Sequence, residues 1–447
     1  MSGSAAFLCE RGNMANLLEY KCPCCGGSLE FNSQAQKMAC PYCGNEFDMA
    51  TLASYDEALN TSQAEDQMNW QSETDDNWSA DEVSGMVTYT CKSCGGEIVG
   101  DQTLGASSCP FCGNPVVMTG QFSGALRPDL VIPFKLDKEA AKAGLEKHLE
   151  GRKLLPKVFK SQNHIDEIKG VYIPFWLFDS DANANIRYSA TKERTWSDAD
   201  YNYTETEYYS VLRSGTLDFD NVPVDGSSTI DNKLMESIEP YDVSEAVDFQ
   251  TAYLSGYFAN KYDETAEDCA PIANERIKTS TRAVFRDTVR GYHSVNEEAC
   301  SISLENAKTR YALYPAWLLS TTWNGQNFLF AMNGQTGKFV GNLPTDKGAY
   351  WKYYGIGAGI SAAAFNLIAW LMKGSDFSAT HIIIAVIAAL LVGFLPVGIM
   401  KSSMTSVRHK VEAQNYIRQD SLNLTVSDDL YLYKKLEKRA RPKPSQQ

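Results

Sequence analysis

Eight of the twelve cysteines in this chain form four Cys-x-x-Cys pairs, and each pair is followed by glycine. The pairs are Cys22/Cys25, Cys40/Cys43, Cys91/Cys94 and Cys109/Cys112. In such a turn the glycine lets the backbone curl, so that amide groups face the sulfurs and two thiolates point at one centre. Fourteen residues separate the first pair from the second, and the third from the fourth. The spacing therefore predicts two four-cysteine metal sites.

The donor type predicts which metal these sites take. A tetrahedral set of soft thiolates suits Zn²⁺, and four cysteines leave no open position for catalysis, so both sites are expected to be structural. Every ligand of the second set lies 69 positions after its counterpart, which indicates an internal duplication. The alternatives are a redox Cys-x-x-Cys pair or coincidence, and two copies at one spacing disfavour both. Cys24, inside the first turn, is expected to be a bystander.

Each four-cysteine set is expected to close a short β-hairpin, which makes a zinc ribbon. Strand-like stretches lie between the pairs at residues 28–32, 36–39 and 97–100. Modules this small cannot bury a real core, so metal binding would supply much of their folding free energy. We assign the first ribbon to residues 17–50 and the second ribbon to residues 87–120.

Two long uncharged stretches occur later in the chain, at residues 353–372 and 382–400. At 1.5 Å rise per residue each stretch would form a helix of about 30 Å, the thickness of a bilayer's hydrocarbon core. Only nine residues connect them. We therefore predict a transmembrane helical hairpin over residues 353–400, with both flanks on one side of the membrane. A pair of core helices in a soluble protein is the alternative, and two uncharged runs of this length disfavour it.

Positive charges predict the side on which the flanks lie. The residues flanking the hairpin are Lys347, Lys352, Lys401, Arg408 and Lys410. The short connection has Lys373, which is partly offset by Asp376. Positive residues concentrate on the cytoplasmic side of membrane proteins. We expect a protein of the inner cell membrane with two spans and with both termini in the cytoplasm.

Residues 128–345 are expected to form an α+β domain with a mainly antiparallel sheet. Asp137 is a helix N-cap, and the helix that it begins is expected to continue through Leu149. Residues 183–190 and 201–219 alternate in polarity and are rich in Tyr, Thr and Val, as in an antiparallel meander. With the ribbons and the hairpin, the expected fold class is multidomain α+β.

A fainter repetition lies inside this domain. The sequence around Pro174 and Trp176 is echoed around Pro315 and Trp317. This echo predicts two related halves. Shared core packing explains the repeated residues better than a ligand site does.

Two charged segments flank these modules. Residues 51–86 contain nine Asp/Glu and no Lys/Arg, which predicts a flexible acidic linker whose role is spacing rather than docking. Residues 401–447 hold ten Lys/Arg against five Asp/Glu. We expect a basic cytoplasmic tail there, which is either attracted to anionic lipid or an ordinary positive flank of the hairpin.

Charge argues against nucleic acid as a partner. The formal net charge of the chain is −14. The first ribbon has only Lys21 and Lys37 against several acidic residues, and the second has only Lys92. A nucleic-acid site needs a basic face that displaces counterions. The ribbons are therefore expected to bind protein rather than DNA.

No group of residues predicts catalysis. The chain has no HExxH motif and no GxSxG turn, and Cys269 and Cys300 lack any local signature of a nucleophile. We therefore expect that the protein is not an enzyme. A transporter is a further alternative, but two spans without a charged residue make a poor transport path.

The ribbons resemble the transcription factor IIB-type zinc ribbon group. Together with the hairpin they resemble a family of bacterial membrane-anchored zinc-ribbon proteins, and the resemblance continues at residues 153–159, 170–179, 314–319 and 331–338. Members of this family are often labelled primosomal helicase-like. That label does not fit the chemistry of this chain, because residues 334–338 lack the spacing and the final hydroxyl of a phosphate-binding loop.

The resemblance implies a role beside membrane-stress machinery, with phage shock protein A-like partners. The leading hypothesis is a membrane-anchored cytoplasmic scaffold, or adaptor, whose zinc ribbons hold protein partners at the inner membrane. The alternative is a membrane-tethered regulator that binds nucleic acid through the ribbons. Ribbon ancestry favours this alternative, and charge disfavours it.

Overall fold

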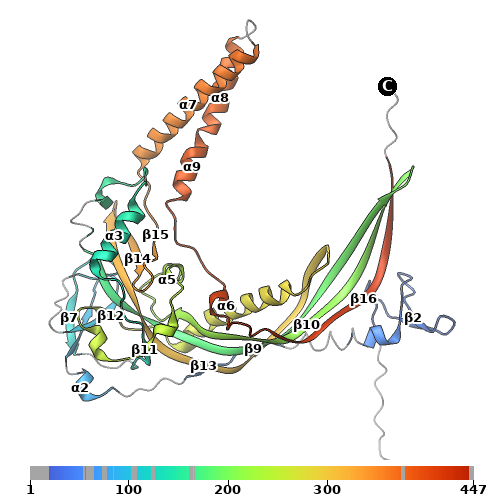
Figure 1. Ribbon diagram of the computed structural model, residues 1–447, viewed down its shortest axis with the longest axis horizontal. Coiled ribbons are helices and arrows are strands. Elements are labelled where there is room, and N and C mark those ends of the chain that lie inside the picture. The colour runs from blue at the N-terminus through green and yellow to red at the C-terminus, as the bar shows by residue number, and fades with distance from the viewer. Residues whose placement is uncertain are drawn as a thin grey trace, which may run out of the picture.

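The computed structural model describes residues 20–53, 56, 65–72, 78–83, 85–101, 108–121, 126–160, 165, 167–373 and 378–441. Figure 1 shows a mixed α+β protein with a large curved sheet and a helical hairpin that projects from one end. The helices are α2 (Ala80–Val83), α3 (Lys138–Leu149), α5 (Asn232–Ile238), α6 (Ala266–Asp287), α7 (Lys347–Lys373), α8 (Ala379–Val392) and α9 (Phe394–Ser402). The strands of the ribbons and linker are β1 (Glu30–Asn32), β2 (Lys37–Ala39), β3 (Glu46–Phe47), β4 (Gln71–Ser72), β5 (Met86–Thr90), β6 (Glu97–Asp101) and β7 (Val117–Gln121). The remaining strands are β8 (Leu130–Val131), β9 (Lys169–Ser197), β10 (Tyr201–Asp225), β11 (Val247–Asp248), β12 (Phe258–Asn260), β13 (Ser294–Trp323), β14 (Gln326–Asn333), β15 (Phe339–Gly341) and β16 (Asn423–Ala440).

The described strands form two sheets. β1, β2 and β3 make a three-stranded sheet of their own, and thirteen strands make the large sheet. β9 and β13 run through its centre, with 29 and 30 residues respectively. Each strand has a run of residues buried on both faces, at 170–178 in β9 and 311–319 in β13, and from Ser180 to Thr191 most of β9 alternates between buried and partly buried residues. This change of pattern is expected where a strand leaves a two-sided core and continues with one face in solvent.

The centre of the large sheet has a local two-fold symmetry. β9 and β13 pair antiparallel, with Tyr172 opposite Pro315 and Pro174 opposite Leu313. In the repeated sequence Leu313 lies 141 positions after Tyr172, and Pro315 lies 141 positions after Pro174. Replacing each residue by its counterpart therefore exchanges the two pairs. The repeated sequence around the two prolines is therefore a structural repeat about an axis between the two strands.

The neighbouring elements follow the same symmetry. β12 runs parallel to β9, and β8 runs parallel to β13 at the equivalent register. The indole N–H of Trp176 donates to the carbonyl of Glu264 at 3.0 Å, and that of Trp317 donates to the carbonyl of Leu136 at 3.0 Å. These carbonyls lie just before α6 and α3, respectively. The predicted halves are thus β8–α3–β9–β10 and β12–α6–β13–β14, and both tryptophans are packing residues.

The hairpin consists of α7, followed by α8 and α9. Two helical segments, Lys347–Met372 and Ala379–Ser402, are long and apolar enough to cross a membrane. The protein buries none of the most apolar stretch of α7 and 22% of that of α8–α9. Small residues bring the helices together: a Cβ on Gly393 would lie 2.9 Å from that of Ala358, and one on Gly357 would lie 3.0 Å from Pro396. The residues of the connection at 374–377 lie outside the described part.

The second ribbon is part of the large sheet. β5, β6 and β7 pair with one another, and β6 also pairs with β12. The described residues of the acidic segment lie against the same body. β4 pairs with β13, Trp70 packs on Phe178 with ring centroids 4.8 Å apart, and Trp78 packs on Phe249. In these residues, the segment that was predicted to be a flexible linker packs along the large sheet. Its two tryptophans hold it there.

The C-terminal segment contains a long β-strand, whereas its composition predicted a basic tail beside the membrane. β16 pairs antiparallel with β10 from Thr216 to Tyr201. Many of its positive side chains are paired along this edge; Lys434, for example, forms an ion pair with Glu205 at 3.1 Å. In Figure 1 β16 and β10 lie at the end of the molecule away from the hairpin base. Composition does not distinguish a basic tail from an edge strand, because lysines are also common on exposed sheet edges, where they block further pairing.

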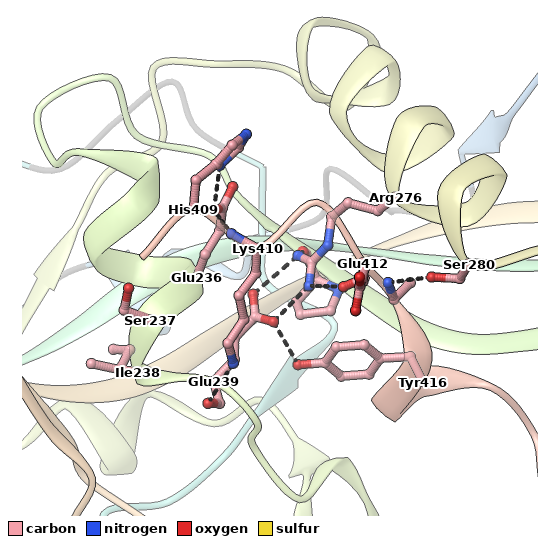
Figure 2. A network of polar contacts seen from close by, with 12 residues as sticks. Glu236, Ser237, Ile238, Glu239, Arg276, Ser280, His409, Lys410, Glu412 and Tyr416 are labelled. Atoms are coloured by element: carbon pink, nitrogen blue, oxygen red, sulfur yellow. Dashed lines mark hydrogen bonds and ion pairs between the residues drawn. The ribbon is translucent and has the colours of Figure 1, made fainter. Parts of the chain in front are cut away.

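Residues 404–417, which we call the strap, connect the hairpin to β16. The strap crosses α5 and α6 and is held by the network in Figure 2. Buried Arg276 of α6 binds Glu239 through Nη2 and Oε2 at 2.6 Å, and the hydroxyl of Tyr416 donates to the same carboxylate at 3.0 Å. The amide of Ala413 donates to Ser280 Oγ at 2.6 Å. The strap therefore fixes the exit of the hairpin to the domain.

Candidate metal centres

The two predicted cysteine sets are each assembled in one place. The four sulfurs of Cys22, Cys25, Cys40 and Cys43 lie within 4.8 Å of one another, and so do those of Cys91, Cys94, Cys109 and Cys112. The Sγ–Sγ distances Cys22–Cys43 and Cys25–Cys40 are both 3.5 Å, and the equivalent distances in the second set are 3.5 and 3.7 Å. Four Zn–S bonds of about 2.3 Å in a tetrahedron place sulfurs about 3.8 Å apart. A disulfide needs about 2.05 Å, so the geometry fits a metal ion and not two disulfides.

Each Cys-x-x-Cys turn is built by the same hydrogen bonds. In the first turn the amide of Gly26 donates to the carbonyl of Cys22 at 2.8 Å, and the amide of Cys22 donates to the carbonyl of Gly27 at 2.7 Å. Gly26 has φ 73°, in the left-handed region where glycine avoids the steric cost of a Cβ. The corresponding glycines of the other three turns have φ between 74° and 79°. We call each of these turns a knuckle.

The knuckles direct amide groups at the sulfurs. Burial raises the pKa of Cys40, but the backbone N–H groups of Cys43 and Tyr42 and the neighbouring thiols outweigh it, and its pKa is lowered to about 7. Cys91 has the same environment, and its pKa is also lowered to about 7. One thiol in each set is therefore close to its metal-binding, deprotonated form at neutral pH.

Comparison with known proteins places the chain among relatives. The uncharacterized protein YdjG of Bacillus subtilis (strain 168) is 34% identical over 358 residues, which are 80% of this chain and 99% of that protein. The chain belongs to the YdjG family. No protein-family profile matches the chain, and no solved structure matches it. The name of the relative carries no biochemical activity, so the chemistry of this YdjG-family protein rests on its own residues.

Both ribbons contain an asparagine that hydrogen-bonds to one of the cysteine ligands. Asn45 donates through Nδ2 to Cys43 Sγ at 3.4 Å and to Cys24 Sγ at 3.1 Å. In the second ribbon Asn114 donates to Cys112 Sγ at 3.4 Å and to Ser93 Oγ at 2.9 Å. Cys24 and Ser93 thus occupy the same position, and neither belongs to its four-sulfur group. The bystander role predicted for Cys24 agrees with this placement, and sequence reasoning did not single out the asparagines.

The ribbons of this YdjG-family chain are attached to the body in different ways. The first knuckle of ribbon 1 contacts β16, where Tyr433 packs beside Cys24 against the small core of the ribbon. Ribbon 2 is attached through β6 and through its second knuckle, where Phe111 is buried and its carbonyl accepts a hydrogen bond from Asn327 Nδ2 at 3.0 Å.

The other cysteines of the described residues have surroundings unlike those of an activated nucleophile. Cys269 is buried, and desolvation together with nearby carboxylates raises its pKa. Desolvation also raises the pKa of Cys300, although the nearby positive charge of Arg282 acts to lower it. His148 is half-buried, and desolvation lowers its pKa. A nucleophilic cysteine needs a lowered pKa and access, and these two thiols are held in their protonated form. Cys9 lies outside the described residues.

Proposed function

We propose that this YdjG-family protein is a membrane-anchored adaptor that uses two zinc ribbons and a sheet domain to hold protein partners at the cytoplasmic face of the bacterial inner membrane. The observation that carries the proposal is the combination of an exposed apolar hairpin with two four-cysteine modules in one chain. The modules supply no open coordination position, so their metals serve architecture rather than catalysis.

The metal is Zn²⁺, and the modules are of the transcription factor IIB-type. Support comes from the all-thiolate donor set, from the sulfur separations and from the paired knuckles at the ends of short hairpins. Soft thiolates in a tetrahedral arrangement favour Zn²⁺ over harder divalent ions. In each ribbon the ion takes the place of the core that so short a segment cannot build.

The hairpin spans the bilayer, with its open end toward the cytoplasm. The positive residues at that end support this orientation, because Lys347, Lys352 and Lys401 stand at the two helix termini that adjoin the domain. Trp351 and Tyr354 lie in the first turns of α7 and provide the amphipathic rings that favour the membrane–water boundary. The connection at the opposite end carries one Lys and one Asp in sequence.

Protein is a better partner for the ribbons than nucleic acid. In ribbon 1 one of the two lysines, Lys37, is paired with Asp48 at 3.6 Å. Exposed Glu30 and Glu46 add negative charge to the same module. Phosphate backbones need an excess of positive charge, whereas the acidic residues of ribbon 1 outnumber its two lysines and Lys92 is the one basic residue in the sequence of ribbon 2.

The adaptor is tested by quantitative affinity purification of the tagged full-length chain from detergent-solubilised membranes. We expect at least one protein, a phage shock protein A-like protein being the first to look for, to co-purify with the wild type. Cys22→Ser or Cys91→Ser should reduce its recovery at least about tenfold, because loss of one ligand unfolds a ribbon. Cys24→Ser, which removes no ligand, is the matched control. The proposal is wrong if both ligand variants retain every partner of the wild type.

A further inference from the structure

The two ribbons are copies of one module, and they contact the rest of the chain through opposite knuckles. Ribbon 1 rests on β16 through its first knuckle, at Cys24. Ribbon 2 rests on the sheet domain through its second knuckle, where Pro110 and Phe111 are buried. The second knuckle of ribbon 1, with Pro41 and Tyr42, is exposed. Among the described residues, the surface that is an interface in one copy is therefore uncovered in the other.

Ribbon 2 shows how a second knuckle is recognised. The ring of Phe111 lies over Gly96, where an added Cβ would come within 2.9 Å of the ring and 3.0 Å of the methyl group of Thr229. Only 3% of Phe111 is exposed. The side-chain amide of Asn327 donates to the Phe111 carbonyl at 3.0 Å. Recognition thus uses apolar neighbours for the ring and an amide donor for the carbonyl.

Ribbon 1 presents the same knuckle without a cover. The ring of Tyr42 lies over Gly27 as that of Phe111 lies over Gly96, because an added Cβ there would be 2.5 Å from it. Yet 76% of Tyr42 is exposed, and Phe31 and Met49 of the same ribbon are 55% and 44% exposed. The equivalent ring of Phe111 is buried in an interface, so the exposed ring of Tyr42 indicates a surface that a partner covers. The tyrosine hydroxyl adds a polar tip of the kind enriched at protein interfaces.

We propose that the Tyr42 knuckle is the docking surface for a protein partner, which presents an apolar pocket for the ring and a side-chain amide donor for the Tyr42 carbonyl. This inference rests on the proposed adaptor function and names the surface that performs it. The partner is a different protein and not a second copy of the chain, because the pocket that receives a knuckle in this chain is filled by Phe111. The excess of acidic over basic residues in ribbon 1 disfavours a nucleic-acid or anionic lipid surface as its occupant.

The surface is tested with a benzophenone amino acid placed at position 42 of the full-length chain in membranes. The same probe at Met118, which is 60% exposed at the position equivalent to Met49 in ribbon 2, is the matched control. We expect position 42, and not position 118, to cross-link one protein. A cross-link to residues 1–19 of the same chain, or to a second copy, would overturn the proposal, and so would the absence of any cross-link.

The cross-linked protein is then purified, and its affinity for the full-length chain in nanodiscs is measured. Tyr42→Ser should weaken binding at least about 30-fold, the effect of removing an interface hot spot. Tyr42→Phe, which restores the residue type of ribbon 2, should bind within about threefold of wild type because the ring is kept. Both variants should retain two metal ions, which excludes unfolding of the ribbon.

The outcomes separate this inference from the function on which it rests. If the wild type and Tyr42→Ser bind the partner equally, the adaptor function stands and the Tyr42 surface is refuted. If the wild type itself holds no protein partner, both the adaptor function and the surface are refuted.

Discussion

At the scale of single residues, the duplicated ribbons act as controls for each other. Cys24 and Ser93 stand at the same position of the same knuckle and accept the same kind of hydrogen bond from Asn45 and Asn114. The second ribbon thus shows that a hydroxyl serves as well as a thiol there. The four ligands of each set differ from this position in pointing at a common centre.

The first prediction concerns metal content. The wild type should bind two zinc ions per chain, Cys24→Ser should still bind two, and Cys22→Ser and Cys91→Ser should each bind one, because a three-thiolate site loses affinity. Elemental analysis of purified chains measures this ratio. Cys91→Ser should also lower the thermal stability of the sheet domain, whereas Cys22→Ser should leave it unchanged. Only ribbon 2 shares the large sheet. A single zinc in Cys24→Ser would show that Cys24 is a ligand.

At the scale of elements, the strap depends on one buried ion pair. The side chains of Arg276 and Glu239 are each 2% exposed, and they form two hydrogen bonds of 2.6 and 3.0 Å. Glu239 also accepts the hydroxyl of Tyr416 from the strap. Two charges so far from water are tolerated because each compensates the other.

The second prediction follows from this compensation. Arg276→Met should lower the free energy of unfolding by about 3–5 kcal/mol, because it leaves the Glu239 carboxylate buried without its partner. Adding Glu239→Leu should recover most of that loss. Lys135→Met, which breaks a more exposed pair with Glu245, should cost at most about 1 kcal/mol. Denaturant unfolding of the detergent-solubilised chain measures all three, and equal losses for Arg276→Met and Lys135→Met would contradict the account.

Much at this scale could be predicted from sequence. The helix capped by Asp137 ends at Leu149 as expected, and the eight cysteines form the two expected sets. Local patterns were sufficient in these cases, because an N-cap, a helical period and a Cys-x-x-Cys turn are each decided by a few neighbouring residues.

The elements that sequence reasoning missed depend on distant pairing. β16 has an amphipathic alternation interrupted by lysines, and its partner β10 lies about 220 residues earlier in the chain. Sequence reasoning missed the contact of Tyr433 with ribbon 1 and the packing of the acidic segment on the sheet for the same reason. No local pattern contains this information, because β-propensity reflects packing against neighbours that tertiary structure supplies.

At the scale of the whole molecule, a two-fold repeat at the centre of the sheet carries unequal additions. The half that contains β9 and β10 extends into a long antiparallel arm that these strands form with β16, and we call this arm the blade. The half that contains β13 and β14 continues through β15 into the hairpin. Figure 1 shows the hairpin and the blade at opposite ends of the curved sheet. The hairpin and ribbon 1 therefore occupy different ends of one body.

The third prediction is the topology of the proposed membrane protein. A fluorescent protein fused after Gln447 should fluoresce, and alkaline phosphatase at the same position should be inactive, because the positive flanks keep this end in the cytoplasm. Alkaline phosphatase inserted at Ser378, in the connection between α7 and α8, should be active. Active phosphatase after Gln447 would place the ribbons outside the cell and remove the basis of the adaptor.

The contact between Cys24 and Tyr433 has a consequence for biosynthesis. The N-terminal ribbon leaves the ribosome first, and the strand on which it rests leaves almost last. At about 5–20 residues per second the gap between them lasts roughly 20–80 s. During this time the ribbon can capture a metal ion before β16 exists. The newly made ribbon must therefore stay soluble by itself, and it reaches its resting place only when translation is nearly complete.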